Sequence, residues 1–123
     1  MNPINPSTTF ALHRRWQHHR MHIRCGLSPH QAWRIAAYLQ LGDQLADRGH
    51  ACPLHLQLRM LRTLLSTATD AQLPLVWRQC CLQAAHAPLD WLREVLGVHD
   101  PLALQAVECA CERARRQLPH MSD

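Results

Sequence analysis

The chain has 123 residues, of which 47% are hydrophobic and 18% are charged. This length allows one hydrophobic core and not two, and the composition is that of a folded domain, which argues against a disordered chain. The formal net charge is +4, all 13 basic residues are arginine, and ten histidines add positive charge in mild acid.

No stretch approaches the roughly 18 apolar residues that a membrane-spanning helix needs. The first residues, MNPINPSTTF, also lack the basic and apolar regions of an export signal. We therefore expect a cytoplasmic protein without membrane contact. Its six cysteines are then expected to be reduced, and to act first as buried apolar residues.

Glycine and proline divide the sequence into intervals that favour helices. The first expected helix covers residues 10–25 and ends at Gly26, which can adopt a left-handed conformation. The second covers residues 29–48, with Ser28 as its cap and a proline as its first residue. Both helices thus have a start or stop signal in the sequence.

The third expected helix begins near Pro53 and fades over residues 66–70. Its leucines recur at spacings of four, three and four, which is typical of a helix packed on a core. These residues are Leu54, Leu58, Leu61 and Leu65.

The fourth expected helix starts at Pro74 and ends before Pro88, whose ring disfavours helical geometry in the preceding residue. One helical stripe of this segment is apolar. It consists of Trp77, Cys80, Cys81, Ala84 and Ala85.

The fifth expected helix is short, over residues 88–97, with Asp90 in its first turn and a glycine at its end. Asp100 and Pro101 repeat the signal of a cap followed by proline and open the sixth helix. The apolar stripe of that helix is Leu104, Val107, Cys111, Ala114 and Leu118.

These segments predict an all-α protein, a compact single-domain bundle of five to six helices. Residues 1–9 are expected to be a flexible leader, residues 10–118 the helical domain, and residues 119–123 a flexible tail. The four tryptophans are spread over four of the helices, and we expect them to anchor the core.

The first helix contains the run HRRWQHHRMHIRC, and no acidic residue precedes Asp43. Helical spacing predicts one side that packs on the core, formed by Trp16, His19 and Ile23. It predicts another side that faces water, formed by Arg14, Arg15, His18 and His22.

An acid-free arginine surface attracts an anionic partner. A partner protein with an acidic surface is the favoured interpretation, and nucleic acid is the alternative. A second copy of the chain is a further candidate partner. The residues expected to make the contact are Arg14, Arg15, Arg20 and Arg24.

Metal binding is a second hypothesis, with zinc or iron as the candidate ion. His18 and His22 are separated by four residues, so their side chains can meet on one helix face. His50, Cys52 and His55 form another half-site around the start of the third helix. Structural zinc usually needs four ligands, so the two halves would have to converge; otherwise these histidines are solvated or held in the core.

We find no catalytic motif in the sequence. It contains no G-x-S-x-G, no glycine-rich phosphate loop and no H-E-x-x-H. The protein is therefore not expected to be an enzyme, and no residue is expected to be catalytic.

The stretch LRTLLSTATDAQLPLVWRQCCLQAAHAPLDWL, residues 61–92, resembles the FagA family of small proteobacterial proteins. The similar features are the leucine run, T-A-x-D, L-P-x-x-W-R-x-x-C-L and A-x-x-P-L, and IRCGL upstream is similar too. The resemblance covers about residues 23–96. It implies a cytoplasmic bacterial protein linked to iron limitation or oxidative stress, and it supplies no reaction.

Four positions of the resemblance deserve a test: Asp70, Trp77, Arg78 and Cys81. We expect Asp70 to cap a helix or to pair with Arg78 across a turn, and Trp77 to lie in the core. Together these observations favour a small accessory or regulatory protein that acts through a partner.

Overall fold

The computed structural model describes residues 6–119 of the chain. Within this range it contains six α-helices and no strand, which confirms the expected all-α bundle. The helices are α1 (Pro6–Cys25), α2 (Trp33–Asp47), α3 (Pro53–Ala68), α4 (Leu75–Ala84), α5 (His86–His99) and α6 (Pro101–Gln117). No helix among the described residues is long and apolar enough to cross a membrane.

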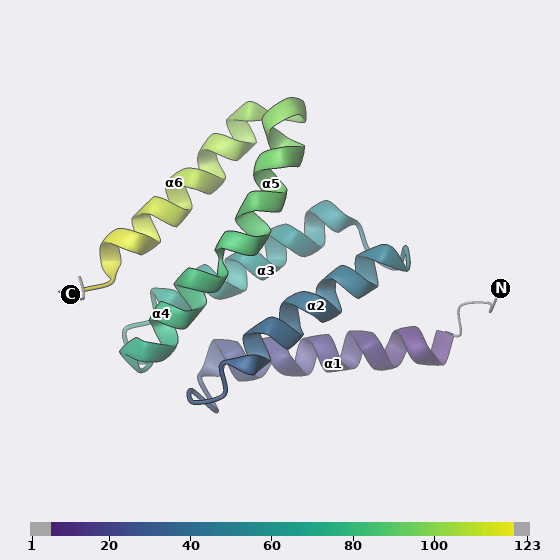
Figure 1. Cartoon of the computed structure of the whole chain (residues 1–123), viewed down its shortest axis with the longest axis horizontal. Coiled ribbons are helices and arrows are strands. Elements are labelled where there is room, and N and C mark those ends of the chain that lie inside the picture. Colours follow the sequence, from purple (N-terminus) through teal and green to yellow (C-terminus); the bar gives the residue numbers. More distant parts are fainter. Residues whose placement is uncertain (1–5, 120–123) are drawn as a thin grey trace.

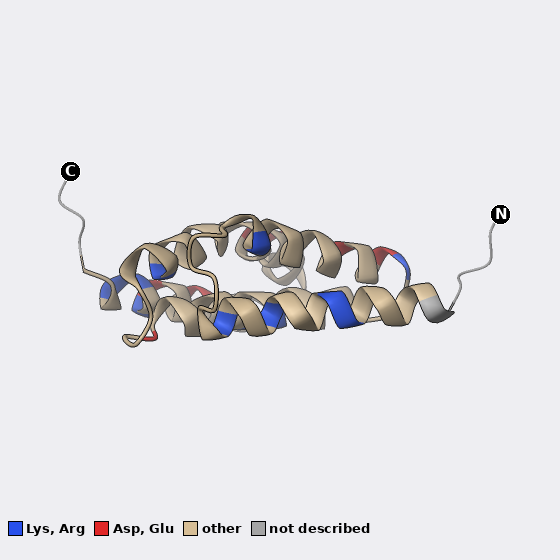
Figure 2. Cartoon of the chain, turned by 90° about the horizontal axis from the view of Figure 1, so that it is seen from below, with Lys and Arg blue, Asp and Glu red and all other residues tan. Residues whose placement is uncertain are grey.

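Helix α3 is the centre of the bundle and contacts all five other described helices. Helices α1 and α2 form a hairpin on one side of it, and α5 and α6 form a second hairpin on the other side (Figure 1). Seen edge-on, the helices make a flat slab (Figure 2). Because α1 and α2 lie at one edge of the slab, the outer side of α1 is left uncovered.

Helix α1 ends as predicted at Cys25, where Gly26 has a φ of 60°. It begins earlier than expected, at Pro6, so residues 6–9 belong to the helix and not to a leader. The rest of the expected leader, residues 1–5, and residues 120–123 of the expected tail lie outside the described residues.

The predicted start of α2 is wrong. Ser28 does not cap this helix; its carbonyl oxygen accepts a hydrogen bond of 2.9 Å from the Gln31 N–H in a turn, and α2 begins at Trp33. The chain must reverse direction between α1 and α2. The proline that was expected to open α2 lies in this turn, before the helix begins.

The core face of α3 is broader than its leucine stripe. Leu61 is buried as expected, but the other three stripe leucines are only partly covered. Leu56, Met60 and Leu64 are buried, and so is Thr67, whose hydroxyl donates to the Thr63 carbonyl at 2.7 Å. Because α3 is surrounded by five helices, polar residues that bond within the helix can also be buried.

Pro88 does not end a helix. It is the third residue of α5, where its missing N–H breaks no intrahelical bond. Helix α5 then continues through Gly97 to His99, so Asp90 lies beyond the first turn. The start of α6 is as predicted, because the Asp100 carboxylate accepts from the Ala103 N–H at 3.1 Å.

The tryptophans divide between core and surface. Trp16 and Trp77 are fully buried, and the Trp16 ring stacks on Tyr38 with 5.2 Å between centroids. Trp91 is partly buried. Trp33 is 57% exposed, which contradicts its expected role as a core anchor.

Candidate functional site

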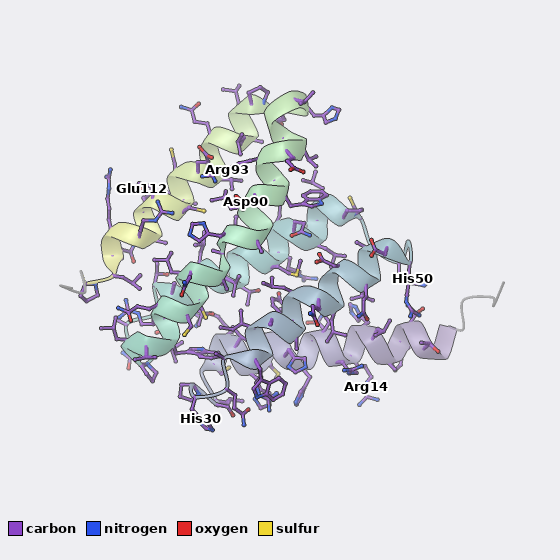
Figure 3. The ribbon with its side chains drawn as sticks, viewed as in Figure 1. Arg14, His30, His50, Asp90, Arg93 and Glu112 are labelled. Carbon is purple, nitrogen blue, oxygen red and sulfur yellow. The ribbon has the colours of Figure 1, made fainter. Side chains whose placement is uncertain are left out.

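Helix α1 has the two sides that its sequence predicts. Trp16 and Ile23 are fully buried, and His19 keeps only 7% of its surface exposed. On the other side, Arg14, Arg15 and His18 are exposed and His22 is half-buried. In Figure 3 the Arg14 side chain points away from the bundle.

The first turn of α2 extends this surface. The Arg34 guanidinium lies 4.8 Å over the Trp33 ring, and the ring of His19 meets Trp33 edge-on at 5.8 Å. Arg34 is also held by a hydrogen bond from its Nε to the Gln31 side-chain oxygen at 2.6 Å. We call this combined surface the basic face. Its residues are Arg14, Arg15, His18, His22, Trp33 and Arg34.

Burial and, second to it, neighbouring positive charges lower the pKa of His19 and His22 beside the exposed arginines. For His19 the first cause is burial and the second is Arg34, and the same order holds for His22. The Nδ1 atoms of both imidazoles are buried without a hydrogen-bond partner. The face therefore has a positive potential and two imidazoles that an added negative charge would help to protonate.

The two proposed metal half-sites lie apart. The rings of His18 and His22 come together, with 4.4 Å between their centroids. His50 instead lies beside the start of α1, where its Nε2 is 2.8 Å from the Thr9 hydroxyl (Figure 3). His18 lies nine residues further along α1 than Thr9, about 14 Å at the rise of a helix.

Cys52 and His55 accompany His50 at the start of α3. Within residues 6–119, no three or more His, Cys, Asp or Glu side chains group closely enough to hold a metal ion. The structure thus brings His18 and His22 together, but His50, Cys52 and His55 lie too far away to share a metal ion with them.

Two of the four arginines expected to bind a partner are held by other residues. Arg24 Nη1 forms an ion pair with the Asp70 carboxylate at 2.8 Å, and Arg20 Nε donates to the Gln17 side chain at 2.9 Å. Arg14 and Arg15 remain as the exposed arginines of α1's outer side. The Asp70 carboxylate offsets the charge of Arg24, whereas the bond from Arg20 to a neutral amide orders its side chain and leaves its charge in place.

Contrary to expectation, Asp70 neither caps a helix nor pairs with Arg78; its Oδ1 accepts a hydrogen bond of 3.0 Å from the Gln72 N–H in the turn after α3. Its charged partner is Arg24 from α1, and the hydrogen bond from Arg24 is the main reason that the pKa of Asp70 is lowered. Arg78 donates from Nε to the Ala68 carbonyl at 2.8 Å, at the end of α3. The carbonyls in the last turn of a helix lack intrahelical partners, so Arg78 completes α3 and leaves Asp70 free for α1.

The other two positions of the resemblance lie in the core. Trp77 is buried as predicted and donates from Nε1 to the Ile23 carbonyl at 2.9 Å. Cys81 is fully buried, and burial raises the pKa of its thiol to about 12. All four positions thus hold helices together, and none presents a reactive group at a surface.

A groove of about 740 Å³ lies between the first half of α1 and the start of α3. Buried side chains form its floor, namely Trp16, Leu45 and Leu56. The walls carry Phe10 and His13 from α1, and His55 and Arg59 from α3. One end is bounded by Thr9, His50, Ala51 and Cys52.

Sequence reasoning missed four of these residues, which are Trp33 and Arg34 in the basic face and His13 and Arg59 in the groove. A signal for the groove was present, because residues 9, 13 and 16 on α1 follow helical spacing, and so do residues 55, 56 and 59 on α3 together with residue 52 just before it. Helical spacing does not show which other helix each of these stripes faces.

No family model, curated protein or solved structure matches the chain. The resemblance to the FagA family therefore rests on the sequence motifs within residues 23–96.

Proposed function

We propose that the protein is a small non-enzymatic accessory or regulatory protein that binds an acidic surface of a partner protein through the basic face. The observation that carries this proposal is a set of arginines without ion pairs, two on the outer side of α1 and one over the exposed Trp33 ring. Within residues 6–119, Arg14, Arg15 and Arg34 make no ion pair. An acidic partner would therefore meet these charges without breaking an ion pair among the described residues.

The mixture of residues favours a protein partner over nucleic acid. Tryptophan, methionine and arginine are enriched at the centre of protein interfaces. Trp33 is 57% exposed, Met21 on the outer side of α1 is 62% exposed, and Arg34 is already ordered over the Trp33 ring. A single-stranded nucleic acid needs several aromatic platforms, and the whole chain has one Phe and one Tyr besides its four Trp.

The cellular setting is part of the same proposal. The resemblance to the FagA family supports a bacterial cytoplasmic protein linked to iron limitation or oxidative stress. If zinc or iron takes part, the His18–His22 pair is where it would bind, with the remaining ligands supplied by the partner. Iron-starved cells are therefore the appropriate source for the partner.

The test compares two double variants with the same change in charge. Arg15→Glu/Arg34→Glu reverses the basic face, whereas Arg62→Glu/Arg113→Glu reverses two exposed arginines on α3 and α6. We expect the wild type and the second variant to capture the same partner from lysates of iron-starved cells. The first variant should lose that partner at least tenfold, as measured by quantitative mass spectrometry.

Two further measurements examine the chemistry of the contact. An acidic surface raises the pKa of His19 and His22, so binding takes up protons and should tighten as the pH falls from about 8 to about 6.

Equal capture by both charge-reversed variants would contradict the proposal. Salt-sensitive binding of a labelled DNA or RNA duplex that is lost in the first variant would favour the nucleic-acid alternative.

A further inference from the structure

We propose that the groove between α1 and α3 binds an amphipathic organic anion, with its carboxylate at Arg59 and its apolar body along the floor toward Ala51. This function goes beyond the basic face, which lies on the outer side of α1. The groove volume of about 740 Å³ falls within the range of sites for small organic ligands, about 300 to 1,000 Å³.

The floor of the groove suits an apolar body. Trp16, Leu45 and Leu56 line it, and Phe10 stands at the rim with 63% of its surface exposed. The guanidinium of Arg14 lies 5.9 Å from the centroid of the Phe10 ring. A ligand that covered Phe10 and the floor would remove this apolar surface from water, with a gain of about 25 cal/mol per Å².

The charge of the lining selects the head group. Among the residues that the structure describes, no Asp or Glu lines the groove, and Arg59 is the one permanently charged side chain in its lining. In the described part of the chain, Arg59 makes no ion pair. A guanidinium can bind a carboxylate through two parallel hydrogen bonds, and the imidazoles of His13 and His55 offer further donors on both walls.

The positions along α3 set the direction of the ligand. Arg59 is the last α3 residue of the groove lining, and its exposed guanidinium lies at the end away from the α2–α3 loop. Cys52 lies seven residues earlier on the same helix face, about 10 Å away at the rise of a helix. At that end, the hydrogen bond between His50 and Thr9 joins the α2–α3 loop to α1. An elongated body therefore has room between the head group and this closed end.

The probes are three ten-carbon chains that differ only in the head group, namely decanoate, decanol and decylamine. We expect isothermal titration calorimetry to show decanoate binding at least tenfold more tightly than decanol, and decylamine binding more weakly than either. Equal affinity for decanoate and decanol would overturn the role of Arg59. A complete lack of decanoate binding to the wild type would overturn the proposal as a whole.

Matched variants locate the ligand. Arg59→Gln should weaken decanoate binding at least tenfold, whereas Arg62→Gln removes the same charge on the same helix outside the groove lining and should leave it unchanged. Ala51→Phe should obstruct the closed end and weaken decanoate and decanol alike. Circular dichroism would establish that each variant keeps its helices.

The two sites can be separated experimentally. The Arg15→Glu/Arg34→Glu variant should bind decanoate as the wild type does, because neither residue lines the groove. Equal losses of decanoate binding in Arg59→Gln and Arg62→Gln would contradict the proposed site, whatever the outcome of the partner experiment.

Discussion

At the scale of single residues, Gly42 shows how closely the first three helices approach each other. It lies inside α2 and is buried, although glycine in a helix interior is usually unfavourable. A Cβ atom at this position would overlap the Met60 side chain and lie 3.1 Å from Trp16 Nε1. The absence of a side chain thus lets α1 and α3 pack against α2.

Replacement of Gly42 by alanine should destabilise the fold. Overpacking of a core costs about 1–3 kcal/mol, and the better helix propensity of alanine returns about 1 kcal/mol, so we expect a net loss of about 1 kcal/mol. Urea denaturation followed by circular dichroism measures this change. The matched control is Gly97→Ala in α5, where the nearest atom would be an ordinary contact at 3.8 Å.

The control should behave in the opposite way. Gly97→Ala places alanine in a helix without a clash, and we expect a gain of about 0.5–1 kcal/mol. A gain of similar size for Gly42→Ala would show that Met60 and Trp16 adjust freely, and that the close approach is not required.

At the scale of helices, the end of α1 is joined to the connection between α3 and α4 and to the first turn of α4. The Arg24–Asp70 ion pair and the hydrogen bond from Trp77 to Ile23 act at this place. They link residues that are 46 and 54 positions apart in the chain. The residues that resemble the FagA family include IRCGL at the end of α1 and the segment with Asp70 and Trp77. At these positions the side chains join α1 to the segments after α3.

Replacement of Asp70 by asparagine should make stability less dependent on acid. The folded pKa of Asp70 is lowered, so its contribution is present above the unfolded value of about 3.9 and is lost as the pH falls through the folded value. We therefore expect Asp70→Asn to lower the urea midpoint at pH 7. The difference from the wild type should disappear in strong acid.

Asp47→Asn is the control for this prediction. Asp47 is exposed at the end of α2, and within the described residues it makes no ion pair. Its replacement should leave the urea midpoint at pH 7 unchanged or slightly higher, because a negative charge at a helix C-terminus is unfavourable. Equal losses in both variants would contradict the junction described above.

At the scale of the whole molecule, the cysteines report on folding. Cys25, Cys52 and Cys109 are exposed, whereas Cys81 and Cys111 are buried. Burial raises the pKa of both buried thiols, to about 12 for Cys81. Because the thiolate is the reactive form, the buried pair is protected both by the lack of access and by protonation.

Iodoacetamide should therefore label the chain in two phases. At pH 8 we expect rapid labelling of Cys25, Cys52 and Cys109, and labelling of Cys81 and Cys111 only as the protein unfolds. Peptide mass spectrometry over time, with and without urea, measures both phases. Rapid labelling of Cys81 in the native protein would sink the idea that α4 is firmly packed on α3.

Much of the local structure could be predicted from the sequence. The end of α1 at Gly26, the start of α3 at Pro53 and the Asp100 cap of α6 follow from signals within a few residues. The buried side of α1, with Trp16 and Ile23, follows from helical spacing in the same way. In each case the deciding interactions lie within one helix or at its end.

The candidate site was less predictable, because it depends on contacts between distant segments. The outer side of α1 was expected, but Trp33 joins it only because α2 folds back beside His19. Asp70 lies nearer in sequence to Arg78 than to Arg24, yet the packing of α1 against the α3–α4 connection makes Arg24 its partner.

The sequence by itself determined the helical class, most of the helix ends and the acid-free outer side of α1, since these depend on local propensity and on helical spacing. Only the tertiary structure decided that the His18–His22 pair lies apart from His50 and that a groove opens between α1 and α3. The physical reason is that spacing fixes which side chains share a face of one helix. Which face another helix covers is decided by how all the helices pack around α3.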